Sequence, residues 1–222
     1  MSASFPDLRG VQAVIFDMDG TLVDSEPYTG VSIRRLLSAE GIEDPLLDVE
    51  VFHGCTWQAI SDGLVARHPG LTGRCTPGRL EAVFEDLWTE TPPPFIPGAR
   101  EALAAARAVA RTAICTSSRR PAVARLVAAR GLGALLDTVV CADDFGPSKP
   151  DPACFRLTAE RLGVAPERCL VFEDSDAGRT AAARAGMLVV GVGPLPGATV
   201  PPRFVIPDYT VLPDDFFPSI AR

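Results

Sequence analysis

Lysine is almost absent from this sequence of 222 residues: it has 21 lysine and arginine residues together, and Lys149 is the only lysine among them. Cysteine pairs are also lacking, since the six cysteines include no Cys-x-x-Cys. This argues against a zinc site. Cys115, Cys141 and Cys169 lie in or beside apolar runs. We therefore expect buried free thiols rather than a disulfide framework.

The sequence has no excess of positive charge, because the net charge is -7. Nucleic acids and membrane surfaces both attract a basic patch, so we expect neither as a partner. A small anionic substrate stays possible, because a metal ion can reverse the sign of the charge inside a cleft. No apolar run approaches the roughly 18–20 residues of a membrane span, and the N-terminus lacks a charged-then-apolar signal pattern. We expect a cytoplasmic enzyme.

Short apolar runs alternate with helical patterns along most of the chain. Such alternation predicts βαβ units and a parallel sheet with helices on both faces, a Rossmann-like three-layer α/β/α core. The strands are predicted at 11–16, 112–115, 138–141, 169–172 and 188–192, with a further short strand at 209–212. The helices between them are predicted at 98–108, 121–130, 152–162 and 177–185.

One stretch after the first strand has helical patterns only. They lie around 30–40, 57–67 and 79–90, and three consecutive prolines, 92–94, follow them. We predict a discontinuous core at 1–24 and 93–222, with a helical cap domain inserted at 25–92. Ligands bind at the carboxyl edge of open parallel sheets, so we expect the cap to cover that edge.

Two carboxylates, Asp17 and Asp19, follow the first predicted strand directly and precede Gly20. Like charges this close raise the energy unless a cation neutralises them. Hard oxygen ligands suit Mg²⁺. A calcium-type loop or a simple acidic turn would fit this motif taken alone.

Hydroxyl groups follow the second predicted strand, in Thr116-Ser117-Ser118-Arg119. Free N–H groups and hydroxyls at a strand-to-helix turn can hold an anion. Ser118 could equally cap the next helix, which would leave Thr116 free.

Lys149 lies between two prolines, in the loop before the helix predicted at 152–162. Asp151 is a plausible N-cap there, with Pro152 as the first helical residue. A loop lysine is usually solvated, but this chain uses arginine everywhere else. A compact ammonium at one point therefore suggests a role that arginine cannot fill.

A second acidic pair, Glu173-Asp174, follows the fourth predicted strand. Polar or acidic residues at a helix N-terminus can simply stabilise the start of the helix, and Ser175 or Asp176 could have only that role. Glu173 and Asp174, however, come directly after an apolar run. The chain thus carries carboxylate, hydroxyl, ammonium and carboxylate groups in order at one edge of the predicted sheet.

These residues resemble the haloacid dehalogenase-like hydrolase superfamily, and the stretch Asp-Gly-Thr-Leu-Val-Asp-Ser-Glu at 19–26 resembles its β-phosphoglucomutase-like subgroup with a helical cap. The resemblance covers essentially the whole chain. It implies an Mg²⁺-dependent phosphatase that forms an aspartyl-phosphate on Asp17, with Asp19 as general acid and base. It also implies that Thr116 and the Ser117 N–H hold the phosphoryl group, and that Lys149 pairs with it.

The implied metal ligands are Asp17, the Asp19 carbonyl and Asp174, with Glu173 coordinating through water or from the second shell. Dehalogenases share the nucleophile but do not need the second acid, Asp19. Phosphonatase-like members use a cap lysine, and residues 25–92 contain no lysine.

Substrate contacts in the cap are expected from His53, Gly54 and Trp57, and in the core from Ser117, Ser118 and Arg119. His53 could equally be a cap-core residue. Mutases of the subgroup carry an arginine for the distal phosphate where this chain has Trp57, which cannot make a bidentate phosphate contact. Arg34, Arg35 or Arg119 could compensate for that loss.

The resemblance thus favours a phosphatase for a small phosphorylated metabolite such as a sugar phosphate, acting as a monomer. A hexose-phosphate mutase and a non-catalytic ligand-binding relative are the alternatives. The intact set of Asp17, Asp19, Lys149 and Asp174 argues against the second of these.

Overall fold

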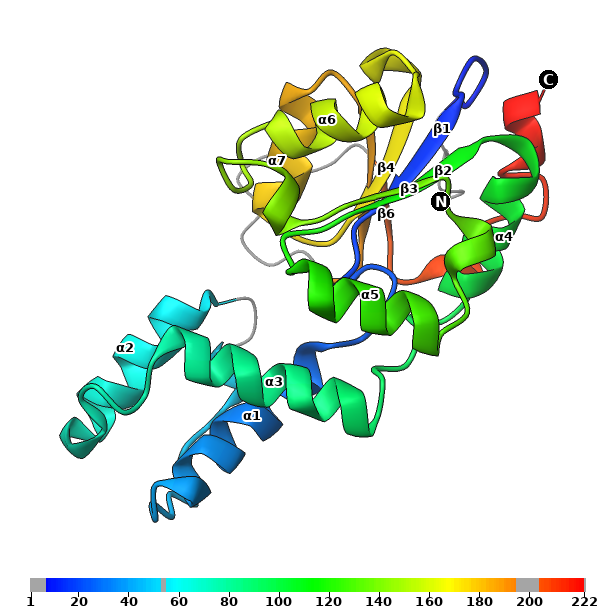
Figure 1. Ribbon diagram of the computed structural model, residues 1–222. Coiled ribbons are helices and arrows are strands. Elements are labelled where there is room, and N and C mark those ends of the chain that lie inside the picture. Colours follow the sequence, from blue (N-terminus) through cyan, green and yellow to red (C-terminus); the bar gives the residue numbers. More distant parts are fainter. Residues whose placement is uncertain (1–6, 53–54, 195–203, 222) are drawn as a thin grey trace. The chain divides into compact units, whose positions relative to one another are not determined.

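The computed structural model describes residues 7–52, 55–194 and 204–221 (Figure 1). The chain divides into two compact units, one of Met1–Asp24 with Pro94–Arg222 and one of Ser25–Pro93. The first contains the sheet, and the second is helical in its described part. That the helical unit serves as a cap stays a prediction.

The first unit is built on a six-stranded parallel sheet in the order β3-β2-β1-β4-β5-β6, which confirms the predicted α/β class. The strands are β1 (Ala13–Phe16), β2 (Arg111–Cys115), β3 (Thr138–Val140), β4 (Cys169–Glu173), β5 (Leu188–Val192) and β6 (Phe204–Ile206). The chain runs outward from β1 through β2 to β3, and from β4 through β5 to β6. The strand order therefore reverses between β1 and β4, the point where such sheets bind ligands.

The α-helices of this unit are α4 (Ala99–Val109), α5 (Arg120–Ala129), α6 (Ala153–Leu162) and α7 (Asp176–Arg184). Alternate residues of a strand face opposite sides of the sheet. Ile15 and Val171 therefore pack with α6 and α7 on one side, in one apolar cluster with Phe155 and Ala181. This gives a three-layer arrangement in which the strands at the centre are buried on both faces.

The opposite face of the sheet is packed by aromatic rings. Phe16 and Phe172 stack at 5.1 Å, and Tyr209 lies 5.2 Å from Phe172. Phe216 and Phe217 each lie 6.2 Å from Phe172, measured between ring centroids. The C-terminal segment thus covers the two central strands directly behind their carboxyl ends.

The strand predicted at 209–212 is wrong: Tyr209–Val211 is a 3-10 helix, and the sixth strand is β6. Asp208 accepts a hydrogen bond from the Thr210 N–H, and the Tyr209 N–H bonds to the Pro97 carbonyl. These contacts turn the chain so that the Tyr209 ring points into the aromatic cluster. Burial of that ring outweighs the strand preference of the sequence.

The helical unit contains α1 (Glu26–Ala39), α2 (Trp57–Arg67) and α3 (Pro77–Glu90). Thr56 and Thr76 cap α2 and α3 by accepting hydrogen bonds from Ala59 N and Arg79 N. The unit has an apolar core of its own, to which α1 contributes Ile33 and Leu36. It is therefore a separately packed body, whose predicted helices at 30–40 and 79–90 begin earlier than expected.

No helix in the described ranges combines the length and the apolar character needed to cross a membrane.

The central aromatic cluster predicts a large stability cost for Phe172→Ala. The ring is fully buried and packs against Phe16 of β1 and against Phe216 of the C-terminal segment. Truncation should lower the free energy of unfolding by about 3–5 kcal/mol. Val205→Ala in β6, where the side chain is 47% exposed, should change it by less than about 0.5 kcal/mol. Urea denaturation measures both values, and equal costs would contradict this description of the core.

Candidate active site

Three carboxylates meet where β1 and β4 end. Phe16 pairs with Phe172, and the Asp17 N–H donates to the Phe172 carbonyl at 3.0 Å. Glu173 is the last residue of β4, and Asp174 follows it. One oxygen of each of Asp17, Glu173 and Asp174 lies within 4.8 Å of the other two. The register of two neighbouring parallel strands therefore assembles the cluster.

Lys149 is the cation that contacts this cluster. Its Nζ donates to Asp17 Oδ1 at 2.6 Å, to Glu173 Oε2 at 2.7 Å and to the Cys115 carbonyl at 3.2 Å. An ammonium has three donors, and all three are used here. The Lys149 side chain is only 6% exposed. A planar guanidinium could not direct its donors to these three acceptors, which gives a geometric reason for the single lysine.

The charges of the cluster do not balance, since three carboxylates face one ammonium. Burial, then Glu173, raise the pKa of Asp174 to about 7, and the same two causes raise the pKa of Asp17 well above its usual range. Burial opposes the charged form of Lys149, but Asp17 and Glu173 outweigh it and raise the pKa of the ammonium. Burial and the neighbouring carboxylates together raise the pKa values of the two acids, and the carboxylates alone raise the pKa of the ammonium.

Thr21 holds Asp174 at two points. Its Oγ1 donates to Asp174 Oδ1 at 2.8 Å and accepts from the Asp174 N–H at 3.1 Å. Asp174 also approaches Gly20 closely, because a Cβ atom on Gly20 would collide with its carboxylate. Gly20 has a φ of +74°, a conformation that L side chains rarely adopt. The turn after β1 thus makes room for a carboxylate from β4 and binds it.

Asp19 points to the hydroxyl groups that follow β2. Ser118 Oγ donates to Asp19 Oδ2 at 2.6 Å, and Thr116 Oγ1 lies 3.5 Å from the same oxygen. Thr116 Oγ1 also accepts the Ser118 N–H at 3.0 Å. Asp19 thus lies beside the hydroxyls and is not one of the three clustered carboxylates. The two acids that follow β1 occupy different surroundings.

The prediction that Ser118 could cap the following helix, leaving Thr116 free, is wrong. Helix α5 begins at Arg120 with Arg119 as its N-cap and no capping side chain from that residue. Asp143 from the turn after β3 accepts the Arg120 N–H at 2.8 Å. Because Asp143 satisfies that end of the helix, the Ser118 hydroxyl is available to Asp19.

In the loop that leads into α6, Pro152 is the N-cap and the helix begins one residue later than predicted. Asp151 there accepts the Ala153 N–H.

The acidic cluster fits a divalent cation. Both Glu173 oxygens have partners, since Oε1 accepts from the Ser175 N–H and hydroxyl and Oε2 accepts from Lys149. Asp17 and Asp174 each use one oxygen in the hydrogen bonds described above, to Lys149 and Thr21. A cation between their other oxygens would offset the surplus charge, with hard oxygen ligands of the kind Mg²⁺ takes. Glu173, whose two oxygens already accept hydrogen bonds, would act on the cation from the second coordination shell.

The contacts described above do not involve the remaining predicted site residues. Ser117 and Arg119 are exposed in the turn between β2 and α5. Trp57 begins α2 in the helical unit, where its ring meets Phe84 edge-on with centroids 5.1 Å apart. Within that unit it packs against the apolar core. His53 and Gly54 lie outside the described residues.

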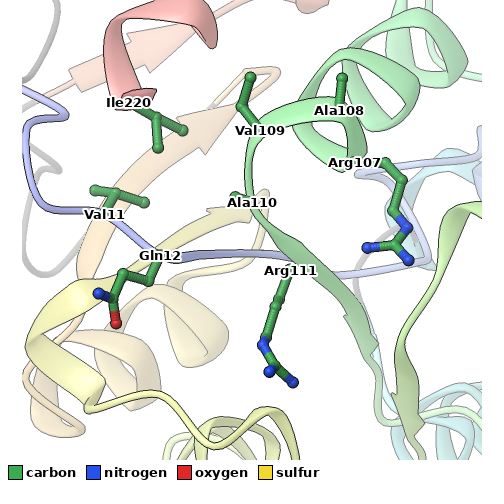
Figure 2. Close-up of a pocket in the computed structure, with 8 residues that line it drawn as sticks. All are labelled: Val11, Gln12, Arg107, Ala108, Val109, Ala110, Arg111 and Ile220. Atoms are coloured by element: carbon green, nitrogen blue, oxygen red, sulfur yellow. The ribbon is translucent and has the colours of Figure 1, made fainter. Parts of the chain in front are cut away.

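A surface pocket of about 410 Å³ lies at the opposite edge of the sheet, where β1 and β2 begin (Figure 2). Val11, Gln12, Arg107 and Arg111 are among the residues that line it. None of the predicted site residues in the described ranges lines it. Arg107 is paired with Asp137 at 3.0 Å, so its charge is already compensated. The pocket is therefore separate from the carboxylate cluster.

The roles of Thr21 and Tyr209 are not predicted by the sequence. Thr21 stands out there only as part of the motif at 17–24, and its link to Asp174 spans 153 positions. The Tyr209 hydroxyl is buried without a hydrogen-bond partner among the described residues. Burial and nearby Asp17 raise the pKa of this phenol well above its usual value. No local pattern indicates either contact.

A sequence profile of the haloacid dehalogenase-like hydrolase family matches residues 11–186. The fructose-1-phosphate phosphatase YqaB of Escherichia coli is 33% identical over 181 residues, covering 81% of this chain and 95% of that protein. Hexitol phosphatase B of Escherichia coli is 31% identical over 207 residues, covering 90% of this chain and 91% of that protein.

A crystal structure of β-phosphoglucomutase from Clostridium difficile superimposes with a TM-score of 0.71. It covers 94% of this chain and 96% of the other, at 22% sequence identity. At that identity the similarity shows a shared fold and no more.

Replacement of Gly20 by alanine should damage the cluster specifically. The new Cβ would displace the Asp174 carboxylate in addition to straining the backbone. We expect Gly20→Ala to lower the free energy of unfolding by about 2–4 kcal/mol and to weaken Mg²⁺ binding.

Gly10→Ala is the matched control for that variant. Gly10 has a φ of +85°, and a Cβ atom added there would meet nothing within 4 Å, so this substitution introduces the backbone strain alone. It should cost about 1 kcal/mol and leave Mg²⁺ binding unchanged. Chemical denaturation and calorimetric Mg²⁺ titration measure both effects, and similar Mg²⁺ affinities in the two variants would contradict the prediction.

The raised pKa of Asp174 predicts how stability depends on pH. Folding raises this pKa from 3.8 to about 7, so the folded protein holds a proton that the unfolded protein has already lost. In chelator, the contribution of Asp174 to stability should therefore be complete below about pH 4 and be lost as the pH rises through about 7. Arginine neighbours lower the pKa values of Asp44 and Asp144, which stay ionised in this window.

Mg²⁺ should raise the melting temperature more at about pH 8, where Asp174 is ionised, than at about pH 5. Thermal melts with Mg²⁺ and with chelator test this. A chelated protein that becomes more stable between those two pH values would contradict the assignment of surplus negative charge.

Proposed function

Because the chain belongs to the haloacid dehalogenase-like hydrolases, we propose that it is an Mg²⁺-dependent phosphatase for a small phosphorylated metabolite, with a sugar phosphate or sugar-alcohol phosphate as the leading class. Two of its relatives are named as phosphatases of fructose 1-phosphate and of hexitol phosphates. The phosphoryl group would be held transiently by Asp17.

One observation carries this proposal: the ammonium of Lys149 bonds to Asp17 at 2.6 Å, beside the buried carboxylate of Glu173 and the half-buried one of Asp174. The hydrogen bond from Lys149 holds the Asp17 carboxylate in one orientation for an incoming phosphorus atom. The family's chemistry is hydrolytic, and the second acid, Asp19, follows β1 closely without joining the cluster. Nucleophile and proton carrier are thereby separate groups.

In the first proposed step an Asp17 oxygen attacks phosphorus while the bond to the ester oxygen breaks. Asp19, protonated, gives its proton to that leaving oxygen. In the second step a water oxygen attacks the same phosphorus and loses its proton to Asp19. The bond between phosphorus and Asp17 then breaks, and inorganic phosphate leaves with both residues restored.

Other side chains would position the phosphoryl group and balance its charge. Thr116 Oγ1 and the Ser117 N–H would donate to its oxygens, and Lys149 would offset the charge that spreads over them during transfer. Asp17 and Asp174, with the Asp19 carbonyl, would hold Mg²⁺, with Glu173 behind them. The ion would polarise the phosphoryl oxygens and neutralise the carboxylates around them.

Hydrolysis is favoured over mutase activity by the residue at position 57. In the β-phosphoglucomutase-like subgroup that the sequence resembles, the mutases bind a second phosphate with an arginine. The Trp57 indole has one donor and no charge. Arg34 is exposed, and Arg35 is paired with Glu90 at 2.6 Å. The fold similarity to a β-phosphoglucomutase does not outweigh this difference.

The proposal predicts Mg²⁺-dependent phosphate release from a panel of sugar and sugar-alcohol monophosphates. Asp17→Asn should abolish release while the melting temperature stays close to that of the wild type, because the change is nearly isosteric. Phosphate release is measured with Mg²⁺ and with chelator. Wild-type turnover by Asp17→Asn would show that the nucleophile is another residue.

Lys149→Arg tests the need for an ammonium. The charge is kept, but a guanidinium cannot reach all three acceptors of Lys149. We expect kcat to fall by about 10²–10³-fold. Arg184→Lys, which changes an exposed arginine that bonds to the Pro150 carbonyl, is the control for a neighbouring substitution and should stay within about threefold. Near-normal kcat in Lys149→Arg would show that charge alone suffices.

A further inference from the structure

Arg179 is a buried arginine that none of the proposed catalytic steps uses. It lies in the first turn of α7 and is 5% exposed. Its neighbours in this helix are small, since Ala177 and Gly178 precede it and Thr180 follows. A long charged side chain in such a place is costly unless its donors are used.

Its guanidinium is directed at the residue that completes the acidic pair. Nη1 donates a hydrogen bond to the main-chain carbonyl of Asp174, and Nη2 lies 3.4 Å from Asp176 Oδ1. Nε has no hydrogen-bond partner in the described part of the chain. The closer contact of Arg179 is therefore with the backbone of Asp174.

Asp174 needs such a restraint. It lies between β4 and α7, beyond the last residue of the strand. Thr21 holds its N–H and one carboxylate oxygen. Arg179 holds its carbonyl, so the residue is fixed at both ends of its backbone.

We propose that Arg179 is a positioning residue for the Mg²⁺ site, which acts by holding the backbone of Asp174 so that its free carboxylate oxygen faces Asp17. This inference rests on the proposed function. It concerns metal affinity rather than the chemical step, because Arg179 reaches Asp174 through the main chain. Groups that orient metal ligands in this way typically contribute about 10–100-fold to affinity.

The test is calorimetric titration of MgCl₂ into the purified protein without substrate. Arg179→Met keeps most of the apolar length and removes the donors, and we expect it to raise the Mg²⁺ dissociation constant about tenfold. Arg179→Lys keeps the charge, but one ammonium cannot span both the Asp174 carbonyl and Asp176. We expect it to raise the constant about threefold.

Arg156→Met is the matched control, because Arg156 is exposed and also donates to a main-chain carbonyl, that of Arg184 at 3.3 Å. It should bind Mg²⁺ like the wild type. The Mg²⁺ concentration for half-maximal phosphate release should shift in parallel with the calorimetric constants, while kcat at saturating Mg²⁺ stays within about twofold.

Wild-type affinity in Arg179→Met, with only a lower melting temperature in chelator, would show a purely structural role and overturn the inference. If Arg179→Met fails to fold, wild-type affinity in Arg179→Lys overturns it instead. An equal loss in Arg156→Met, or no Mg²⁺ binding by the wild type, does so as well. Binding without any phosphate release would contradict the proposed function and leave this inference standing.

Discussion

The attraction between the Lys149 ammonium and the carboxylates of Asp17 and Glu173 is the interaction on which the site depends. Without it, three carboxylates, two of them buried and one half-buried, would face one another at the carboxyl end of β1 and β4. Removing the cation of a buried ion pair, which leaves the carboxylates uncompensated, commonly costs about 3–5 kcal/mol. The pair also fixes the orientation of the Asp17 carboxylate. The same contact thus serves stability and the proposed chemistry.

Other parts of the fold keep this charged cluster in place. The aromatic cluster of Phe16, Phe172 and Tyr209 fixes the two central strands directly behind it. Gly20 and Gly178 leave room for the carboxylates of Asp174 and Glu173, which a Cβ atom at either position would strike. Packing of the core therefore sets the separation of the charges, and the charges themselves would favour greater separation.

The sequence predicts those features that depend on local patterns or on strand order. Alternating apolar runs and helices suffice for a parallel sheet, and an acidic pair after an apolar run suffices to place Glu173 and Asp174 at its edge. The single lysine is informative because arginine replaces it everywhere else. Contacts between distant side chains are different. Ser118 bonds to Asp19 because Asp143 already satisfies the start of α5, and the Tyr209 ring is drawn from a strand conformation by burial. Which of these contacts forms depends on competition between side chains that are far apart in the sequence, so a local pattern does not predict it.

The claim that Asp17 carries the phosphoryl group is tested most directly by trapping it. A reaction with an accepted substrate is quenched in acid within the first turnover, and the digested protein is analysed by mass spectrometry. The account predicts one phosphoryl group on the Asp17 carboxylate in the wild type, lost on treatment with hydroxylamine and absent from Asp17→Asn. A phosphoryl group on another residue, or continued turnover with none on the protein, would contradict it.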